Sequence, residues 1–462
     1  MTSDKHAGQQ PSPMPALASY IAQAINHELP PEVSEKVKFH LLDTLAAMVS
    51  GTHLPAGRFA TTFLLAQGLN SGQATVIGTP YRNTAINAAM ANAMFAHADE
   101  TDDSHAKSLT HPGCAIVAST LAAGELFARS GVQVMRAMAL GYDVCCRLTQ
   151  SLDPYQFRAD GHSSHTFGPN FGAAAAAGTL AGINTLQAQY VMSYAAQQAS
   201  GISCWMRDKD HVEKAFDFGG MAARNGVTAA HMVSLGFTGV EDVFSGERCF
   251  YDAYGRDPKR MALAEELGER FEILDTSIKR WSVGSPIQAP LDSMDALIKE
   301  NSIDLASIES IKVKIPHESL TIVNNREMPE ICLQHILALM LVDSKMSFVA
   351  AHDRSRMQDP KVLEIRKLID LEGNDELSKH MPTRQGIVTI HLKNGTVLEH
   401  YTQAVKGTPP NPMNRLELQE KCIDLMAPII GLSQSNEVCQ QVWGLEQLHH
   451  IAPLMKALTI EA

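Results

Sequence analysis

Apolar residues recur with the period of an α-helix through the first 255 residues of the chain, after a polar start. Leu17, Tyr20, Ile21 and Ala24, for example, fall on one helical face. Clusters of Gly, Pro and Asn separate such stretches, and no strand-like alternation interrupts them. The pattern predicts helices at 37–48, 84–103, 115–127, 132–148, 173–180 and 186–199.

The pattern changes after about residue 274. Residues 308–315 alternate between apolar and polar side chains as a strand does, and 386–405 read as a hairpin around Asn394-Gly395. Helical patterns at 330–342 and 360–371 lie between them. We therefore expect a mostly α protein with three parts: a disordered tail at 1–14, a large all-helical domain from 15–274 and 406–462, and a smaller α+β domain at 275–405.

Composition narrows the possible partners. The 462 residues are 45% hydrophobic and carry a net charge of −12. An acidic chain is poorly suited to nucleic acid, whose phosphates are neutralised by Lys and Arg. No apolar run reaches the roughly 18 residues that a membrane helix needs. The eight cysteines include no CxxC pair and follow no secretory signal, so we expect free thiols in a cytoplasmic protein without structural zinc.

Residues 97–113 hold three histidines and four carboxylates directly after an Ala-rich helical pattern. Acidic groups are unfavourable at the C-terminus of a helix, where the dipole is negative, so their presence indicates a function. Continuing the helix through this segment puts His97, Glu100 and Ser104 on the stripe that is apolar upstream. We expect these three side chains to face the interior or a cleft, and Asp99 and Asp103 to point toward solvent.

The same segment is compatible with a structural role and with a metal site. It could be a satisfied core histidine beside a solvated acidic helix end. The run 99–103 also resembles the Asp-rich helix of isoprenoid synthases, which hold a diphosphate through carboxylate-bound Mg²⁺. That chemistry needs a second acidic helix and a basic cradle, and the chain shows neither clearly.

Three further segments carry candidate chemistry. His162 precedes a glycine-punctuated turn and a poly-Ala helix, and the backbone N–H groups at a helix start favour an anion. Lys214 precedes another Gly-rich helix start. Lys279 and Arg280 lie at the predicted domain junction, where ligand sites are common. Each segment is equally compatible with a purely structural role, as a loop before a closely packed helix or as a surface lysine.

Seven short motifs occur in a fixed order along nearly the whole chain. They are Leu41-Leu42-Asp43-Thr44-Leu45-Ala46-Ala47, the pattern 87–103 ending in His-x-x-x-x-Asp-Asp, Thr110-His111-Pro112, Gly141-Tyr142-Asp143-Val144, the segment from His162 to the poly-Ala run, Ala222-Ala223-Arg224-Asn225-Gly226, and Gly407-Thr408-Pro409 with Asn411-Pro412. Together they resemble the MmgE/PrpD family, which includes 2-methylcitrate dehydratase, cis-aconitate decarboxylase and iminodisuccinate epimerase.

The resemblance implies a helical domain completed by the C-terminal residues, an α+β lid, and a site between them. It also implies a homodimer that acts without metal or cofactor on a small di- or tricarboxylate. The shared chemistry begins with removal of a proton next to a carboxylate. By position, the resemblance assigns the family's site acid, hydroxyl, two histidines and two lysines to Glu100, Ser104, His111, His162, Lys214 and Lys279.

The chain departs from the family pattern in three places. Glu100 replaces the usual aspartate. Arg280-Trp281-Ser282 follows Lys279 where the family has Lys-x-x-Pro, and Gln288 stands where a histidine is expected. The lid motif that usually carries Arg or Lys before Ser-x-x-Tyr reads Pro-Glu-Ile-Cys-Leu-Gln at 329–334. All three departures concern substrate recognition or proton transfer.

We therefore expect a cofactor-independent lyase, either a dehydratase or a decarboxylase, acting on a small polycarboxylate. His111 and His162 are the expected acid/base pair, because histidine is the usual proton carrier near neutral pH. Glu100 and Ser104 complete the catalytic set. The substrate-binding set is Lys214, Lys279, Arg280, His97, Asp103 and Gln288.

Two alternatives from other classes remain. An epimerase or isomerase could use the same scaffold, since loss of an acid/base group at Gln288 could stop elimination and leave only reprotonation. A non-catalytic carboxylate-binding protein is the other. Neither a metal nor a nucleic-acid or membrane partner is expected.

Overall fold

The computed structural model describes residues 11–68 and 72–461. The fold is mostly α, with one four-stranded sheet and one short two-stranded ribbon, and the predicted fold class is confirmed. Residues 1–10 of the predicted tail lie outside the described residues. Among those described, no helix combines the length and apolar composition needed to cross a membrane.

The chain divides into two compact units. The first comprises Met1–Ala98, Asp102–Thr276 and Leu425–Ala462, and the second Asp99–Thr101 and Ser277–Asp424. Two features of this division differ from the sequence boundaries. The second unit takes in three residues from the His97–Gly113 region, and it continues past residue 405 into α19 (Arg415–Ile430).

The first unit is built from helices around a buried central one. Its α-helices are α1 (Met14–Gln23), α2 (Pro31–Gly51), α3 (Pro55–Ala66), α4 (Ala85–Ala96), α5 (Pro112–Leu126), α6 (Gly131–Ser151), α7 (Pro154–Ala159), α8 (Ser164–Ala181), α9 (Thr185–Gln197), α10 (Val212–Ala215), α11 (Met221–Ser234), α12 (Phe250–Tyr254), α20 (Leu432–Trp443) and α21 (Ala452–Ala457). The ribbon of β1 (Ala74–Thr75) and β2 (Arg82–Asn83) was not predicted, and its strands are only two residues long.

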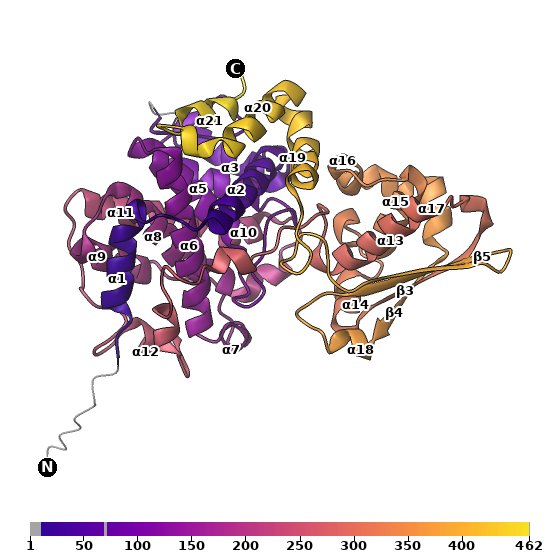
Figure 1. The fold of residues 1–462 in the computed structure, drawn as a ribbon, viewed down its shortest axis with the longest axis horizontal. Helices are drawn as coiled ribbons and strands as arrows, with labels where there is room; N and C mark the ends of the chain where they lie inside the picture. Colours follow the sequence, from indigo (N-terminus) through magenta and orange to yellow (C-terminus); the bar gives the residue numbers. More distant parts are fainter. Residues whose placement is uncertain (1–10, 69–71, 462) are drawn as a thin grey trace, which may run out of the picture. The chain divides into compact units, whose positions relative to one another are not determined.

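Helix α8 is the centre of the first unit and packs against α5, α6, α9 and α11 (Figure 1). Every residue from Ser164 to Leu180 is buried. Small side chains allow this close packing. A Cβ atom at Gly226 of α11 would lie 2.5 Å from the Cβ of Ala173 in α8. The poly-Ala pattern therefore reflects a helix surrounded by other helices.

The second unit is an α+β structure. Its elements are α13 (Gln288–Glu300), β3 (Ile308–Pro316), α14 (His317–Val323), α15 (Leu333–Asp343), α16 (Phe348–His352), α17 (Pro360–Arg366), β4 (Ile369–Asn374), α18 (Asp375–Ser378), β5 (Gly386–Leu392) and β6 (Val397–Thr402). The strand order is β4-β3-β5-β6. Helix α13 packs along β5 and β6, and α15 packs against β4 (Figure 1).

The sheet confirms the strand predictions and adds one strand. β5 and β6 form the expected antiparallel hairpin, and Gly395 takes a φ of +87° in its turn. The predicted helix at 360–371 is half wrong, because it ends at Arg366 and the chain then enters β4. That strand pairs in parallel with β3. Since its hydrogen-bond partners lie more than 50 residues away, the local pattern could not reveal it.

The contact between α8 and α11 yields a stability prediction. Gly226→Ala should destabilise the protein by about 1–3 kcal/mol, because the added methyl group has no room beside Ala173. Gly444→Ala is the matched control, since its Cβ would meet its nearest neighbour at 3.4 Å. Urea unfolding measures both. Equal stability of the two variants would contradict the close packing.

Candidate functional site

The segment after α4 is not helical. Helix α4 ends at Ala96, and His97 is its C-cap residue with φ −110°. The prediction of a helix to residue 103, with His97, Glu100 and Ser104 on one stripe, was therefore wrong. The acidic side chains account for the ending, because they bond to nearby groups in place of continuing the helix. Asp99, for example, accepts hydrogen bonds from both N and Oγ1 of Thr101.

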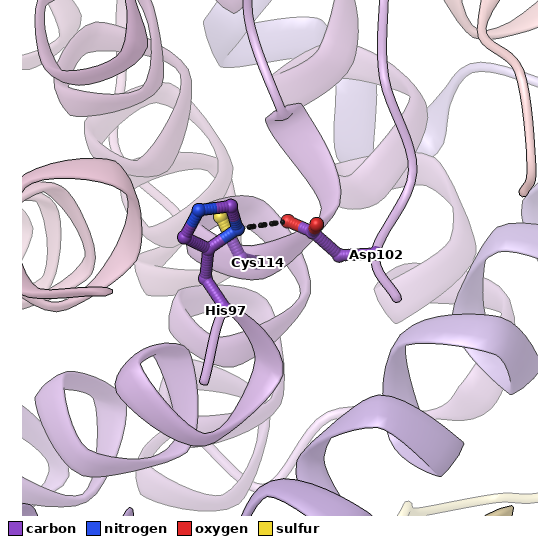
Figure 2. Close-up of side chains that lie close together, drawn as sticks. All are labelled: His97, Asp102 and Cys114. Atoms are coloured by element: carbon purple, nitrogen blue, oxygen red, sulfur yellow. Dashed lines mark hydrogen bonds and ion pairs between the residues drawn. The ribbon is translucent and has the colours of Figure 1, made fainter. Parts of the chain in front are cut away.

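Asp102 joins two histidines. Its Oδ2 lies 2.7 Å from Nδ1 of His97, and its Oδ1 lies 3.2 Å from Nδ1 of His111. Figure 2 shows the first of these bonds, with the imidazole and the carboxylate facing each other across the turn. His111 is the N-cap residue of α5 and precedes Pro112, which fixes the direction in which its ring leaves the helix start.

The Phe218 ring lies between the imidazole faces of His97 and His165. It stacks on His97 with centroids 4.2 Å apart and on His165 with centroids 3.8 Å apart. Phe218 belongs to a π-helical turn, Phe216–Gly220, ahead of α11. Such turns insert one residue into a helix and occur often at functional sites. The insertion places the phenyl ring between histidines from two other helices.

Three histidines lie against this ring and a fourth lies against His97. We refer to the four as the histidine cluster: His97, His111, His165 and His211. The ring of His111 lies 5.2 Å from that of His97 and 5.4 Å from that of His165, and the rings of His97 and His211 are 5.1 Å apart. The members come from the end of α4, the start of α5, the first turn of α8 and the residue before α10.

Lys214 of α10 supplies a cation beside the cluster. Its Nζ lies 5.2 Å from the ring centre of Phe218 and 5.6 Å from that of Trp205. Burial is the main cause that lowers the pKa of His97, with Lys214 and His111 adding to it against the opposing effect of Asp102. Burial, then His111, holds the pKa of His165 well below its usual value. Both imidazoles are therefore neutral at pH 7.

Nε2 of His97 and Nδ1 of His165 are buried and make no hydrogen bond within the described part of the chain. An unpaired buried polar atom costs free energy unless a ligand or water satisfies it. These atoms, with the ammonium group of Lys214 nearby, are therefore candidate contacts for a polar ligand.

His97, Asp102 and Cys114 also lie close enough to be considered as metal ligands, with one atom of each within 4.8 Å of the others (Figure 2). Cys114 Sγ, however, donates to the carbonyl oxygen atoms of His111 at 3.1 Å and Phe218 at 3.4 Å. Burial, with Asp102 and Asp103, raises the pKa of this thiol well above its usual value. A thiol that keeps its proton is a poor metal ligand.

Asp103 is buried, contrary to the expectation that it would face solvent. Its Oδ2 accepts from Nδ1 of His40 at 2.7 Å and from the hydroxyl of Tyr142 at 2.6 Å. Its Oδ1 accepts from the backbone N of Gly113 at 2.9 Å. Asp103 thus ties α2 and α6 to the start of α5. These contacts give it a supporting position behind His111, where the sequence predicted a substrate contact.

His162 lies in a different environment from the histidine cluster. Its ring stacks on Phe157 at 4.5 Å and meets the edges of Phe167 and Tyr254. The histidine that faces His111 is His165, one helical turn further on. The sequence pattern brought this segment forward but favoured the first of its two histidines. It gave no sign that His165, His211 and Phe218 lie together with His97 and His111, and it drew attention to Asp102 only within the acidic run 99–103.

The second unit contains four of the other predicted site residues, Glu100, Lys279, Arg280 and Gln288. Each residue of its short segment Asp99–Thr101 contacts a basic side chain. His352 Nε2 lies 3.0 Å from Asp99, Lys279 Nζ donates to the Glu100 carbonyl oxygen at 2.6 Å, and Lys421 Nζ donates to the Thr101 carbonyl oxygen at 3.4 Å. Lys279 and Glu100, both predicted for the site, therefore contact each other.

Arg280 and Gln288 have structural partners within the second unit. Arg280 pairs with Asp292 and Asp295 and lies 4.1 Å from the ring centre of Trp281. Gln288 donates to the carbonyl oxygen atoms of Trp281 and Val283. Both amide hydrogens of Gln288 are thus used to hold the 281–283 loop. Ser104, in the first unit, is half-buried beside the short loop closed between His105 and Thr110.

The fold and the cluster together define a class. Neutral buried imidazoles beside an ammonium group are typical of enzymes that move protons on an anionic substrate, here on a mostly helical protein of two units. The MmgE/PrpD N-terminal domain matches residues 15–261 and the MmgE/PrpD C-terminal domain matches residues 281–445. The chain belongs to the MmgE/PrpD family, as its motifs indicated.

Curated relatives cover nearly the same length. A cis-aconitate decarboxylase of Aspergillus terreus is 23% identical over 93% of this chain and 92% of its own. The human cis-aconitate decarboxylase is 23% identical over 92% of this chain and 90% of its own. A cis-aconitate decarboxylase-like protein, oryM, of Aspergillus oryzae is 24% identical over 96% of this chain and 97% of its own.

The burial of His165 predicts a pH effect on stability. Its folded-state pKa lies below the unfolded value of about 6.5, so protonation favours the unfolded chain. Its contribution is complete above pH 6.5 and is lost as the pH falls. Between pH 7.5 and 5.5, His165→Phe should lose less stability in urea unfolding than the unsubstituted protein does.

His449→Phe is the matched control, because His449 is an exposed residue of the same unit. It should show the pH dependence of the unsubstituted protein. If His165→Phe loses as much stability as this control, His165 is not held neutral by the fold.

Proposed function

We propose that the protein is a lyase that acts on a small di- or tricarboxylate and requires neither metal nor cofactor. The reaction is decarboxylation or dehydration next to a carboxylate. The observation that carries the proposal is the pair of buried neutral imidazoles, His97 and His165, stacked on Phe218, with His111 and Lys214 beside them. The names of the curated relatives support a decarboxylase type of lyase. A homodimer in the cytoplasm stays a prediction.

Lys214 is proposed to hold a substrate carboxylate. An ammonium–carboxylate contact is a charge-assisted hydrogen bond, which is stronger than a neutral one. The apolar rings of Phe218 and Trp205 around the ammonium limit its hydration and strengthen that contact. An anion at this position would also favour protonation of the nearby imidazoles, so binding would prepare them for proton transfer.

His111 and His165 are proposed as the acid/base pair. Nδ1 of His111 is held by Asp102, so Nε2 is the atom available to the substrate. In dehydration, one imidazole removes the proton next to the carboxylate, the electron pair forms the double bond, and the hydroxyl leaves as water with a proton from the other. In decarboxylation, the carbon–carbon bond to the carboxylate breaks and CO₂ leaves. The bonding electrons stay on the neighbouring substrate carbon, which an imidazolium then protonates.

The epimerase alternative stays open. It rests on Gln288 standing where a proton-transferring histidine is expected, and the Gln288 amide holds the 281–283 loop. Incubation in D₂O still separates the reactions. Deuterium in recovered or inverted substrate, with no unsaturated or decarboxylated product, would identify an epimerase.

The Lys214 contact predicts ligand stabilisation. In a melting-temperature screen of small carboxylates that includes cis-aconitate, a ligand at 100 times its Kd should stabilise the protein by about 2.7 kcal/mol. Lys214→Met should lose most of this shift. Lys209→Met is the control, because Lys209 is exposed five residues upstream. Equal shifts in both variants would remove Lys214 from the site.

Turnover of the selected carboxylate tests the choice of histidines. His111→Gln and His165→Gln should each lower kcat by roughly a hundredfold or more, because each removes a proton-transferring group. His162→Gln should retain most of the activity, since its ring packs in the group of Phe157, Phe167 and Tyr254. The reverse result would return the role to His162. Unchanged turnover after treatment with EDTA checks metal independence.

A further inference from the structure

We propose that Asp102 is a positioning residue that holds both His97 and His111 in the tautomer with the proton on Nδ1. The Nε2 atom of each imidazole is then left as a base, and a single carboxylate sets both. The two bonds, 2.7 Å from Oδ2 to His97 and 3.2 Å from Oδ1 to His111, use different oxygens of one group. The tautomer assignment is independent of the proposed function, whereas the expected effect of Asp102 on catalysis rests on that proposed function.

The chemistry of the donors sets the tautomer. An ionised carboxylate accepts hydrogen bonds and cannot donate them. Both histidines approach Asp102 through Nδ1, so each Nδ1 carries the proton. A neutral imidazole has one N–H, and Nε2 of each ring is then an unprotonated base. A carboxylate partner commonly fixes a histidine tautomer in this way.

The surroundings of Asp102 hold this arrangement in place. The carboxylate and the His97 ring are fully buried, and the His111 side chain is 14% exposed. Phe218 stacks on one face of His97, and Nε2 of His97 makes no hydrogen bond in the described ranges. His111 can therefore reach a ligand directly, and His97 holds a second lone pair behind it, with the ring centres 5.2 Å apart.

The adjacent residue stabilises the geometry. Asp103 accepts from Gly113 N, two residues after His111, and so fixes the start of α5 relative to the turn that carries Asp102. Cys114, the third group near Asp102, keeps its thiol hydrogen on backbone carbonyl oxygens. A metal ion held by His97, Asp102 and Cys114 would instead take the lone pair of the His97 ring nitrogen and leave no Nδ1–H.

The test is the ring tautomer in the whole protein, labelled with ¹⁵N at histidine. One-bond and multiple-bond ¹H–¹⁵N correlations at pH 7.5 distinguish Nδ1–H from Nε2–H, and His97→Gln and His111→Gln assign the two signals. Nδ1–H at both residues is expected. Nε2–H at either residue, or a His97 nitrogen bound to a metal that elemental analysis detects, overturns the proposal.

Asp102→Asn sharpens the test. The amide offers one acceptor oxygen and one NH₂ donor, so one of the two rings must accept at Nδ1 and move its proton to Nε2. Asp143→Asn is the matched control, because Asp143 is an equally buried carboxylate bonded to Tyr20 and the Glu272 backbone. It should leave both tautomers unchanged. If both His97 and His111 keep Nδ1–H in Asp102→Asn, the result contradicts the proposal. Should that variant not fold, the spectrum of the unsubstituted protein decides alone.

The catalytic consequence is separable. Asp102→Asn should lower kcat by roughly a hundredfold or more with KM changed only a few-fold, and Asp102→Glu should restore part of kcat. If Asp102→Asn switches the tautomer of His97 or His111 while kcat is unchanged, the acid/base role of that histidine fails. The positioning of the two rings by Asp102 still stands. If the unsubstituted protein has Nε2–H at His97 or His111, the positioning fails whatever the turnover.

Discussion

The burial of two adjacent carboxylates is the constraint on which the site depends. Asp102 and Asp103 follow the end of α4 and lose nearly all contact with water. Because a buried carboxylate without donors is very unfavourable, each must be supplied with them. Asp103 takes donors from α2, α6 and the start of α5, which are parts of the scaffold. Asp102 takes them from the two histidines. One carboxylate therefore ties three helices together, and its neighbour bonds two histidines of the cluster.

The same burial accounts for the electrostatics of the histidine cluster. Imidazoles removed from water favour their neutral form, and the charge of Lys214 adds to the effect on His97 and His165. His97 and His165 are therefore held as neutral imidazoles close to an ammonium group.

Particular residues show how far the local sequence pattern reaches. His97, His111 and Lys214 are identified by their types and positions. The two histidines belong to the cluster, and Lys214 lies beside it. The family resemblance assigns the second histidine role to His162 and not to His165, three residues later. Nothing local distinguishes a ring packed on Phe157 from one packed on Phe218. The helical stripe with Glu100 and Ser104 failed because acidic side chains end a helix by bonding to their own turn.

The sequence by itself determined the mostly helical fold, the β-hairpin around Gly395 and the membership of the MmgE/PrpD family, because periodicity, turn residues and ordered motifs are local properties of the chain. Only the tertiary structure decided which histidines meet, that Asp102 joins two of them, that Arg280 pairs with Asp292, and that Gln288 holds the 281–283 loop. The stacking of His97 and His165 on Phe218 joins segments distant along the chain, and no local pattern specifies such a partner. Even the short-range bonds of Asp102 arise because the fold buries this carboxylate beside the two rings.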